Sequence, residues 1–173
     1  ERSYETEAHA ERIAQLCTMI GASIGLTHEE IDKLHLFSML HDIGKIGISD
    51  YILKKDGELT EEEWVEMRKH PEIGYRIAMS SPDFANVADY ILTHHERWDG
   101  KGYPRGLAGK DIPILSRILA VADSYDAMTQ DRVYHKAIPH AEAMEEIHRC
   151  CGTQFDPKVV EVFIREMEKR TGE

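Results

Sequence analysis

Two adjacent histidines, His94 and His95, lead directly into a charged, aromatic and glycine-rich segment that ends at Pro104. Each neutral imidazole carries one hydrogen-bond donor and one acceptor, and both must be matched if the ring is buried. Neighbouring histidines are therefore unusual as packing residues, whereas imidazole is a common ligand for transition metals. The pair indicates a metal site, provided that the rest of the chain supplies further ligands.

The chain supplies further ligand-type residues at helix ends and on apolar stripes. Glu5 and His9 are four residues apart, which places both on one helix face, where they can chelate together. Taken alone, each such residue is more often a satisfied core histidine or a solvated carboxylate. That alternative would have to hold for every member of the set, so we expect a polynuclear metal centre built from facing helices. The predicted ligands are Glu5, His9, His41, Asp42, His70, His94, His95 and Asp123.

Composition limits the chemistry of this centre. Mixed imidazole and carboxylate ligation without thiolate suits iron, manganese, nickel, zinc or cobalt. The net charge of -11 argues against binding a DNA or RNA duplex and against an anionic membrane surface. The three carboxylates among the predicted ligands bring about three negative charges, while two or three divalent ions bring about four to six positive ones. Metal would therefore let an acidic protein attract an anionic substrate.

The elements that must position the ligands are helices, because apolar residues recur at the helical period and hairpin signals are nearly absent. Thr27 with Glu30, and Thr60 with Glu63, have the spacing of a capping box. Residues 45–59 are expected to be looser, and residues 96–113 to form the one long loop. Helices are expected over residues 4–25, from Thr27 to His41–Asp42, from Thr60 to His70, over residues 84–95, and after Pro71, Pro113, Pro139 and Pro157.

The predicted fold class is an all-α, single-domain helical bundle of about seven helices, since 173 residues suffice for one core. We find no apolar run near 18 residues and no leader, so we expect no membrane insertion by this domain. Three cysteines, two of them adjacent, predict a reduced, cytosolic setting. Because the chain begins with Glu1 in a helical pattern, we expect residues 1–173 to be one domain of a longer signalling protein with an N-terminal sensor domain.

Long ordered loops are often functional, and the loop over residues 96–113 begins next to His95. Tyr103 is therefore interpreted as a ligand-contacting residue, the alternative being a tyrosine packed on the bundle. Trp64 and Trp98 are interpreted as packing residues rather than as base-stacking platforms.

The chain resembles the HD-GYP branch of the HD superfamily of metal-dependent phosphohydrolases over nearly its whole length. The central phrase from His94 to Pro104 is highly specific, whereas an isolated His-Asp doublet is not. The resemblance rests on Glu5-Thr6 leading to His9, on His41-Asp42 with Gly44-Lys45, on His70-Pro71-Glu72, on His94-His95-Glu96 with Asp99-Gly100 and Gly102-Tyr103-Pro104, on Gly106-Leu107 and Gly109, and on Ala122-Asp123 running to Asp131-Arg132.

The resemblance implies an HD-domain fold in the bacterial cytoplasm and hydrolysis of cyclic di-GMP to pGpG, in some members further to GMP. It implies a bimetal core of His41, Asp42, His70, His94, His95 and Asp123. Members with an additional Glu and His on the first helix resemble trinuclear iron enzymes, and Glu5 and His9 occupy those positions. Two or three metal ions, iron first and manganese, nickel, zinc or cobalt as alternatives, are therefore expected. GGDEF-domain proteins are further partners that the resemblance allows, and the oligomeric state stays open.

The same resemblance implies which residues contact the phosphates or guanines, namely Lys45, Tyr103, Asp126 and Arg132. Where family members commonly have Arg or Lys three residues after that arginine, this chain has His135, so Lys136 is taken as the substitute contact. The alternatives for Lys45 and Asp126 are a solvated helix-terminal lysine and an exposed helical carboxylate.

The expected mechanism is attack of a metal-bridging hydroxide on the phosphate, with two metals about 3.5 to 4 Å apart. Asp42 would bridge the metals and Lys45 would add positive charge at the non-bridging oxygens. The group that protonates the departing oxygen is not readable from the sequence. Two other functions stay open: an HD phosphohydrolase acting on another cyclic dinucleotide or nucleotide, and a non-catalytic module that binds cyclic di-GMP or a GGDEF protein. The full ligand set favours an enzyme.

Overall fold

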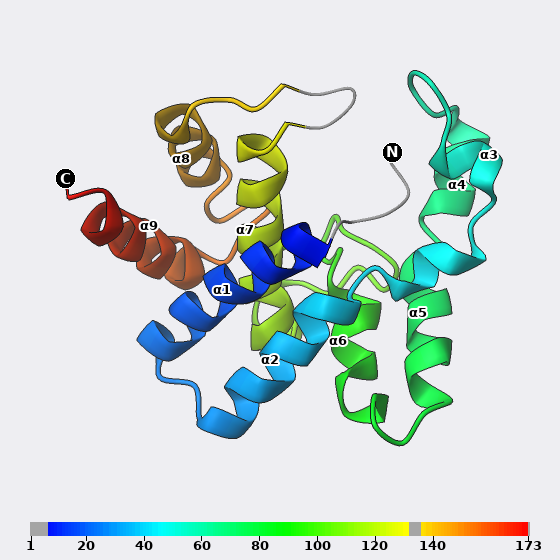
Figure 1. The fold of residues 1–173 in the computed structure, drawn as a ribbon, viewed down its shortest axis with the longest axis horizontal. Helices are drawn as coiled ribbons and strands as arrows, with labels where there is room; N and C mark the ends of the chain where they lie inside the picture. The colour runs from blue at the N-terminus through cyan, green and yellow to red at the C-terminus, as the bar shows by residue number, and fades with distance from the viewer. Residues whose placement is uncertain (1–6, 132–135, 173) are drawn as a thin grey trace.

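Apolar stripes of the long helices meet at the centre of the molecule in a computed structural model, which describes residues 7–131 and 136–172 (Figure 1). The all-α prediction is confirmed: among these residues, β pairing is limited to isolated bridges between Asp99 and Ala108 and between Cys151 and Phe155. The α-helices are α1 (Glu7–Ile24), α2 (His28–Leu40), α3 (Asp50–Leu53), α4 (Glu61–Met67), α5 (His70–Met79), α6 (Ala88–Thr93), α7 (Ile114–Thr129), α8 (His140–Arg149) and α9 (Pro157–Thr171), and the 3-10 helices are η1 (Ile43–Gly47), η2 (Ala85–Val87) and η3 (Gly109–Asp111).

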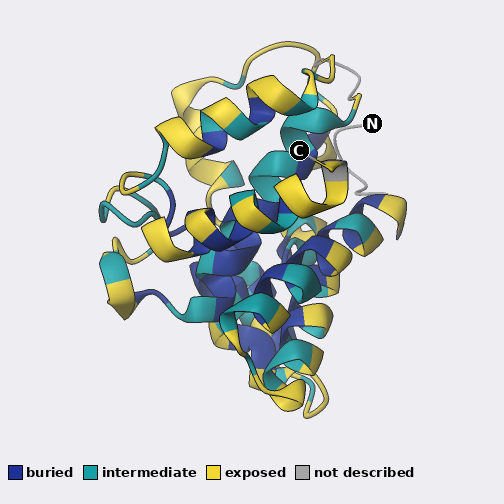
Figure 2. Ribbon diagram, turned by 90° about the vertical axis from the view of Figure 1, so that its left-hand side faces the viewer, coloured by how far each residue is buried: buried dark blue, intermediate teal, exposed yellow. Residues whose placement is uncertain are grey.

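Helix α7 is the central element, with α1, α6, α8 and α9 packed around it. Its Ile118 is fully buried among apolar side chains from the surrounding helices, such as Ile13 of α1 and Phe163 of α9. Burying a side chain of this kind stabilises the fold by about 1.5–3 kcal/mol. Figure 2 shows this buried layer running through the middle of the molecule, with exposed surface on the outer faces of the helices. The helices that carry the predicted ligands are thus tied to one core.

Local signals in the sequence correctly located several helix ends. Both capping boxes form, since Thr27 and Thr60 accept hydrogen bonds from the backbone of Glu30 and Glu63. Asp156 caps α9 by accepting a hydrogen bond of 2.8 Å from the Lys158 nitrogen. Each cap of this kind contributes about 1 kcal/mol.

The sequence-based boundaries were wrong around His70. The helix that begins after Thr60 ends at Met67, and His70 opens the next helix rather than closing this one. Pro71 lacks an N–H group and cannot continue the hydrogen-bond ladder of α4, but it is accommodated in the first turn of α5. Residues 45–59 also contain more structure than expected, because η1 and α3 lie there and Ser49 caps α3.

A second, smaller apolar cluster lies beside the main core and consists of Ile48, Ile52 and Leu53. Figure 1 shows α3 and α4 on the opposite side of the molecule from α8 and α9. Met67 of α4 and Ile73 of α5 pack against this cluster. It therefore holds α4, and the residues that follow it, against the helix that begins with His70.

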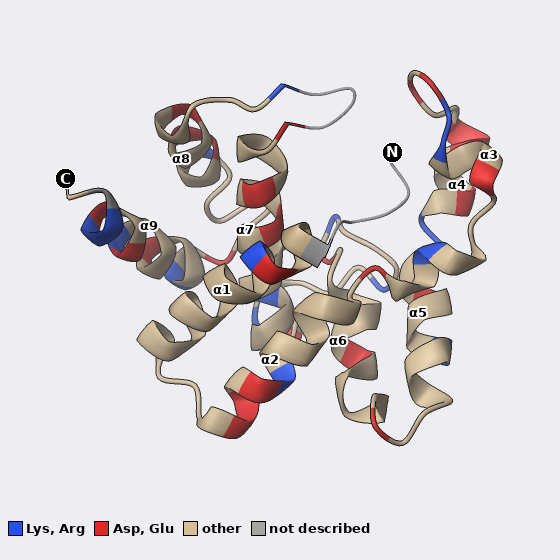
Figure 3. Ribbon diagram, viewed as in Figure 1, with Lys and Arg blue, Asp and Glu red and all other residues tan. Residues whose placement is uncertain are grey.

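Charged residues are distributed over the whole fold. Figure 3 shows acidic segments on α2, α4, α6, α7 and α8, consistent with the net charge of -11. The cysteines Cys17, Cys150 and Cys151 are free. Within the described ranges, no helix combines the length and the apolar character that crossing a bilayer requires.

Candidate metal centre

Ligand-type side chains gather in two neighbouring clusters, and within each cluster the candidate ligand atoms lie within 4.8 Å of one another. We call them the four-residue cluster (Asp42, His70, His94 and His95) and the three-residue cluster (His9, His41 and Asp123). The fold thus brings every predicted ligand together except Glu5, which lies outside the described residues. These side chains come from α1, from the ends of α2 and α6, from the start of α5, and from α7.

Asp42 lies between the two clusters and presents one carboxylate oxygen to each. Its Oδ1 atom is 3.1 Å from Nε2 of His70 and 3.8 Å from Nε2 of His94. Its Oδ2 atom is 3.3 Å from Nε2 of His41 and 2.6 Å from Nζ of Lys45. A carboxylate in this position can join two metal ions.

Three of the histidines are oriented by the same local interaction, a hydrogen bond from Nδ1 to the backbone carbonyl three residues earlier. The Nδ1 atom of His41 bonds the carbonyl of Ser38 at 2.8 Å, and that of His94 bonds the carbonyl of Ile91 at 2.6 Å. His70 does the same with the carbonyl of Met67 at 2.8 Å. The carbonyls of a helix's last turn lack partners within the helix, so a histidine placed just after it satisfies one of them. Because a carbonyl can only accept, Nδ1 carries the proton and Nε2 keeps its lone pair for a metal.

His9 is oriented by a carboxylate instead. Its Nδ1 atom is 2.5 Å from Oδ2 of Asp126, while its Nε2 atom is 3.7 Å from Oδ1 of Asp123. Arg12, one turn along α1, bonds both oxygens of Asp126 at 2.6 and 3.1 Å. Burial raises the pKa of Asp126, but the hydrogen bonds from His9 and Arg12 outweigh it and hold this pKa below its ordinary value. The anionic Asp126 therefore accepts the Nδ1 proton and aims Nε2 of His9 at the three-residue cluster.

The residues of the four-residue cluster fit a cation. The Nε2 atom of His70 is 3.3 Å from that of His94 and 3.1 Å from that of His95. Burial lowers the pKa of His94, and burial together with His94 and His70 lowers that of His95 well below its ordinary value, so both rings stay neutral. In His70 and His94 the Nδ1 atom donates to a backbone carbonyl, so Nε2 is the ring nitrogen that faces the cluster. A metal ion between these Nε2 atoms would be bound by both rings.

The charge state and surroundings of Asp42 also suit the binding of a metal cation. Burial raises the pKa of Asp42, but the neighbouring His41 and Lys45 hold it well below its ordinary value, so the carboxylate is anionic. Its Oδ1 atom is buried and makes no hydrogen bond within the described part of the chain. A buried anionic oxygen in that state is costly without a cation. The donor set of imidazole and carboxylate suits a first-row transition metal.

A close approach of two glycines sets the distance between Asp42 and His70. A β-carbon on Gly44 would collide with the carbonyl oxygen of His70 and would lie 2.5 Å from the nitrogen of Gly74. Only hydrogen at this position lets η1 pack directly on the first turns of α5. The resemblance pointed to Gly44 as part of a motif, and the structure shows why a side chain is not tolerated there.

The loop after His95 is held by Glu96, a buried residue that has no place among the predicted site residues. Its carboxylate accepts hydrogen bonds from the backbone nitrogens of Arg105 at 2.7 Å and Leu107 at 2.9 Å. The far side of the loop is tied to the turn before α9, since the Asp99 nitrogen donates to the carbonyl of Thr153 at 2.8 Å. The loop is therefore an ordered wall beside the centre.

Gly102 and Tyr103 bring this wall onto the four-residue cluster. A β-carbon on Gly102 would lie 2.5 Å from the carbonyl oxygen of His95, so the backbone passes too close for any side chain. The Tyr103 ring stacks on His95 with 4.8 Å between centroids and 21° between planes. Burial first, and then the charge of Asp42, raises the pKa of Tyr103 to about 12, so the hydroxyl keeps its proton.

The other predicted contact residues are spread over different surroundings. Lys45 is in the centre, beside Asp42. Asp126 lies beneath His9, where it contacts a candidate metal ligand and Arg12. Arg132 lies outside the described residues, and Lys136 is exposed next to that gap. Sequence reasoning missed Arg12, although its position three residues after His9 on one helix face was a usable signal.

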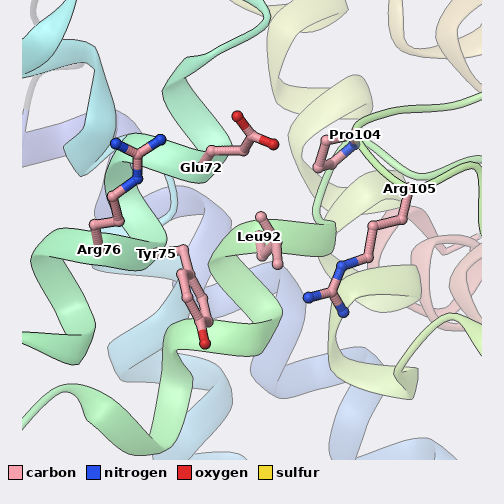
Figure 4. A pocket seen from close by; sticks show the side chains of 6 residues that line it. All are labelled: Glu72, Tyr75, Arg76, Leu92, Pro104 and Arg105. Carbon is pink, nitrogen blue, oxygen red and sulfur yellow. The ribbon is translucent and has the colours of Figure 1, made fainter.

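A shallow hollow of about 240 Å³ lies beside the loop but contains none of the candidate ligands. Figure 4 shows its lining residues: Glu72, Tyr75 and Arg76 of α5, Leu92 of α6, and Pro104 and Arg105 of the loop.

Comparison with known proteins agrees with this geometry. A family model of the HD domain matches residues 2–159. Over 166 residues the chain is 46% identical to a cyclic di-GMP phosphodiesterase from Thermotoga maritima, covering 95% of this chain and 45% of that protein. Over 170 residues it is 42% identical to 3'3'-cGAMP-specific phosphodiesterase 2 from Vibrio cholerae, covering 97% of this chain and 33% of that protein. The chain thus spans less than half the length of either relative.

A solved structure has the same fold. An HDG"Y"P protein from Bdellovibrio bacteriovorus superposes with a TM-score of 0.72 at 20% identity, covering 92% of this chain and 51% of that one. An all-α bundle that gathers histidine and aspartate from distant helices defines the class of metal-dependent HD proteins. The chain belongs to the HD domain family.

Replacing His9 with alanine is expected to lower the metal content by about one ion per chain while leaving a core behind, because His9 belongs to the three-residue cluster alone. Metal analysis of anaerobically purified protein measures this directly. A matched variant, Gln15→Ala on the same helix, should keep the full content, since Gln15 is exposed, bonds Glu11 at the surface and belongs to neither cluster. Loss of all metal from the His9 variant would show that the clusters do not bind independently.

Proposed function

We propose that the chain is a metal-dependent phosphodiesterase that hydrolyses cyclic di-GMP to pGpG; whether pGpG is cut further to GMP is decided by the assay below. The observation that carries this proposal is the pair of clusters joined by Asp42, with the Nε2 atoms of His70, His94 and His95 turned toward one another. Metal ions in such a site supply Lewis acidity and lower the pKa of water, which together make a phosphodiester cleavable at neutral pH.

The chain's own residues then have separable tasks. Asp42 holds the two clusters in fixed relation, and the Nδ1 hydrogen bonds of His41, His70 and His94 fix the direction of their rings. Lys45 places a cation beside the Oδ2 oxygen of Asp42, where it would attract a phosphoryl oxygen. The stacked pair of His95 and Tyr103 forms the side of the site that the substrate would meet first.

We propose iron as the metal, with manganese, nickel, zinc and cobalt as the alternatives that the same donors accept. The four-residue cluster and His41 with Asp123 would hold two ions. His9, and Glu5 if it reaches the site, would complete a third. We further propose the bacterial cytoplasm as the location, where cysteines such as the three free ones stay reduced.

A second candidate substrate is 3'3'-cGAMP, because one close relative is named for that specificity. It shares the phosphodiester linkages of cyclic di-GMP and differs in one base. The metal centre does not distinguish the two, since it would act on the phosphate alone. We also propose GGDEF-domain proteins as binding partners, which would contact the surface around the loop over residues 96–113.

Protein purified without oxygen is expected to carry about two or three transition-metal ions per chain and to convert cyclic di-GMP to pGpG. Chelation should abolish turnover, and adding back single metals should identify the one that restores it. The assay is run in parallel on 3'3'-cGAMP and on linear dinucleotides. Bound metal without turnover of any of them would contradict the enzymatic proposal and favour a binding module. Faster turnover of 3'3'-cGAMP would select the second candidate.

A further inference from the structure

The aromatic wall of the metal centre continues outward to an arginine. The guanidinium carbon of Arg68, which follows α4, lies 5.7 Å from the centroid of the Tyr103 ring and 5.9 Å from that of Trp64. Tyr103 in turn stacks on His95 of the four-residue cluster. A continuous row of planar groups therefore leads from the metal centre to the surface, and we call it the rim row (His95, Tyr103, Arg68 and Trp64).

Trp64 differs from the packing residue that the sequence suggested. It is 41% exposed, and Arg68 beside it is exposed as well. Trp98, by contrast, is tied down by a backbone hydrogen bond to the carbonyl of Gln154 and lies under Arg117. Trp64 therefore leaves part of an aromatic face open at the surface, next to the cation of Arg68.

Within the part of the chain that the structure describes, Arg68 has no ion-pair partner, whereas Arg12, Arg97 and Arg117 each bond an aspartate. Its N–H groups therefore stay available in the plane of the guanidinium. In a chain with 32 acidic residues, an arginine left this way next to a metal centre is suited to an incoming anion.

The position of Arg68 follows from the local fold. Its backbone nitrogen donates to the carbonyl of Trp64 at 2.9 Å, which closes the last turn of α4, and two residues later His70 enters the four-residue cluster. The same short segment thus places a metal ligand and the arginine.

We propose that Arg68 is a substrate-binding residue that holds a pair of acceptor atoms of the cyclic dinucleotide at the mouth of the site. This rests on the proposed function, since it takes a dinucleotide as the ligand. Two sources of paired acceptors fit a guanidinium: the oxygens of the phosphate that is not being cut, and O6 with N7 of a guanine. Trp64 offers its exposed face to the neighbouring base.

The test compares wild type with Arg68→Ala and Arg68→Lys in metal-loaded protein. Binding of a non-hydrolysable phosphorothioate analogue of cyclic di-GMP is measured by calorimetry, and kcat and KM by product formation. Losing a bidentate, charge-assisted contact should weaken binding and raise KM by about 10-fold to 100-fold. We expect kcat to change by less than about threefold, because Arg68 is not a candidate metal ligand. Lysine keeps the charge without the bidentate geometry and should recover only part of the loss.

A matched control is Arg76→Ala, because Arg76 is an exposed arginine that lines the hollow beside the loop, and this hollow contains none of the candidate ligands. It should bind like wild type. Comparing cyclic di-GMP with cyclic di-AMP separates the two sources of acceptors: an equal loss for both ligands assigns Arg68 to phosphate, and a loss confined to cyclic di-GMP assigns it to guanine.

Two results are decisive. Equal binding by wild type and Arg68→Ala overturns the proposal, whatever the turnover. Weaker binding by Arg68→Ala, in a wild type that binds the analogue but hydrolyses no dinucleotide, supports the role of Arg68 and overturns the proposed enzymatic function.

Discussion

Alanine in place of Asp42 is expected to lower turnover of cyclic di-GMP by about 10³-fold or more. Asp42 contacts both clusters, one oxygen facing each, so its loss removes a ligand from each and the charge between them. Metal ions contribute several kcal/mol of transition-state stabilisation, and about 1.4 kcal/mol corresponds to a tenfold change in rate. Product formation and metal content of the purified variant measure the effect.

The control for this variant is Asp89→Ala. Asp89 is an exposed carboxylate on α6, the helix that leads into His94. It should keep the metal content and turnover of wild type. A melting temperature close to wild type for Asp42→Asn would show that the loss is chemical rather than structural. Turnover that persists in Asp42→Ala would rule out the role assigned to this carboxylate.

Alanine in place of Gly44 is expected to cost about 3 kcal/mol of folding free energy, which lowers the melting temperature of a domain of this size by about 6–12 °C. The added methyl group would meet the backbone of His70 and Gly74, and backbone cannot move aside as a flexible side chain can. Any relief separates η1 from α5, and with them Asp42 from His70. Metal affinity should therefore fall together with stability.

Gly47→Ala provides the comparison within the same 3-10 helix. The three atoms nearest to a β-carbon there all belong to the Ile73 side chain, the closest at 2.9 Å, and these can shift. The expected cost is below about 1 kcal/mol, with metal content retained. Thermal unfolding followed by circular dichroism, with metal analysis of the same samples, measures both variants. Equal stability of the two would show that the contact between Gly44 and the first turn of α5 is not tight.

Helix positions were largely predictable because their signals are local. Thr27 and Glu30 are three residues apart, and the hydrogen bonds that they exchange need nothing else from the fold. The boundary at His70 was missed because it does not depend on local signals alone. Pro71 signals a break, but whether the residue before it ends one helix or starts the next depends on what α5 packs against.

Residue types predicted the metal chemistry, but not how the ligands are supported. Asp126 was expected to contact substrate, by resemblance, which stays a prediction; the structure adds that it lies against His9 and Arg12. His9 and Asp126 are 117 residues apart in the chain, and nothing local relates their side chains. Trp64 was expected to pack and is exposed beside Arg68.

The sequence by itself determined the helical class, the helix caps, the acidic character and the set of histidines and carboxylates suited to metal. Periodicity, capping and ligand chemistry act within a few residues, so they can be read without the fold. Only the tertiary structure decided that Asp42 stands between two clusters, that Asp126 orients His9, and that Tyr103 extends the centre toward Arg68. These relations arise from the packing of α1, α5 and α7 around one core, which joins residues that are distant in the chain.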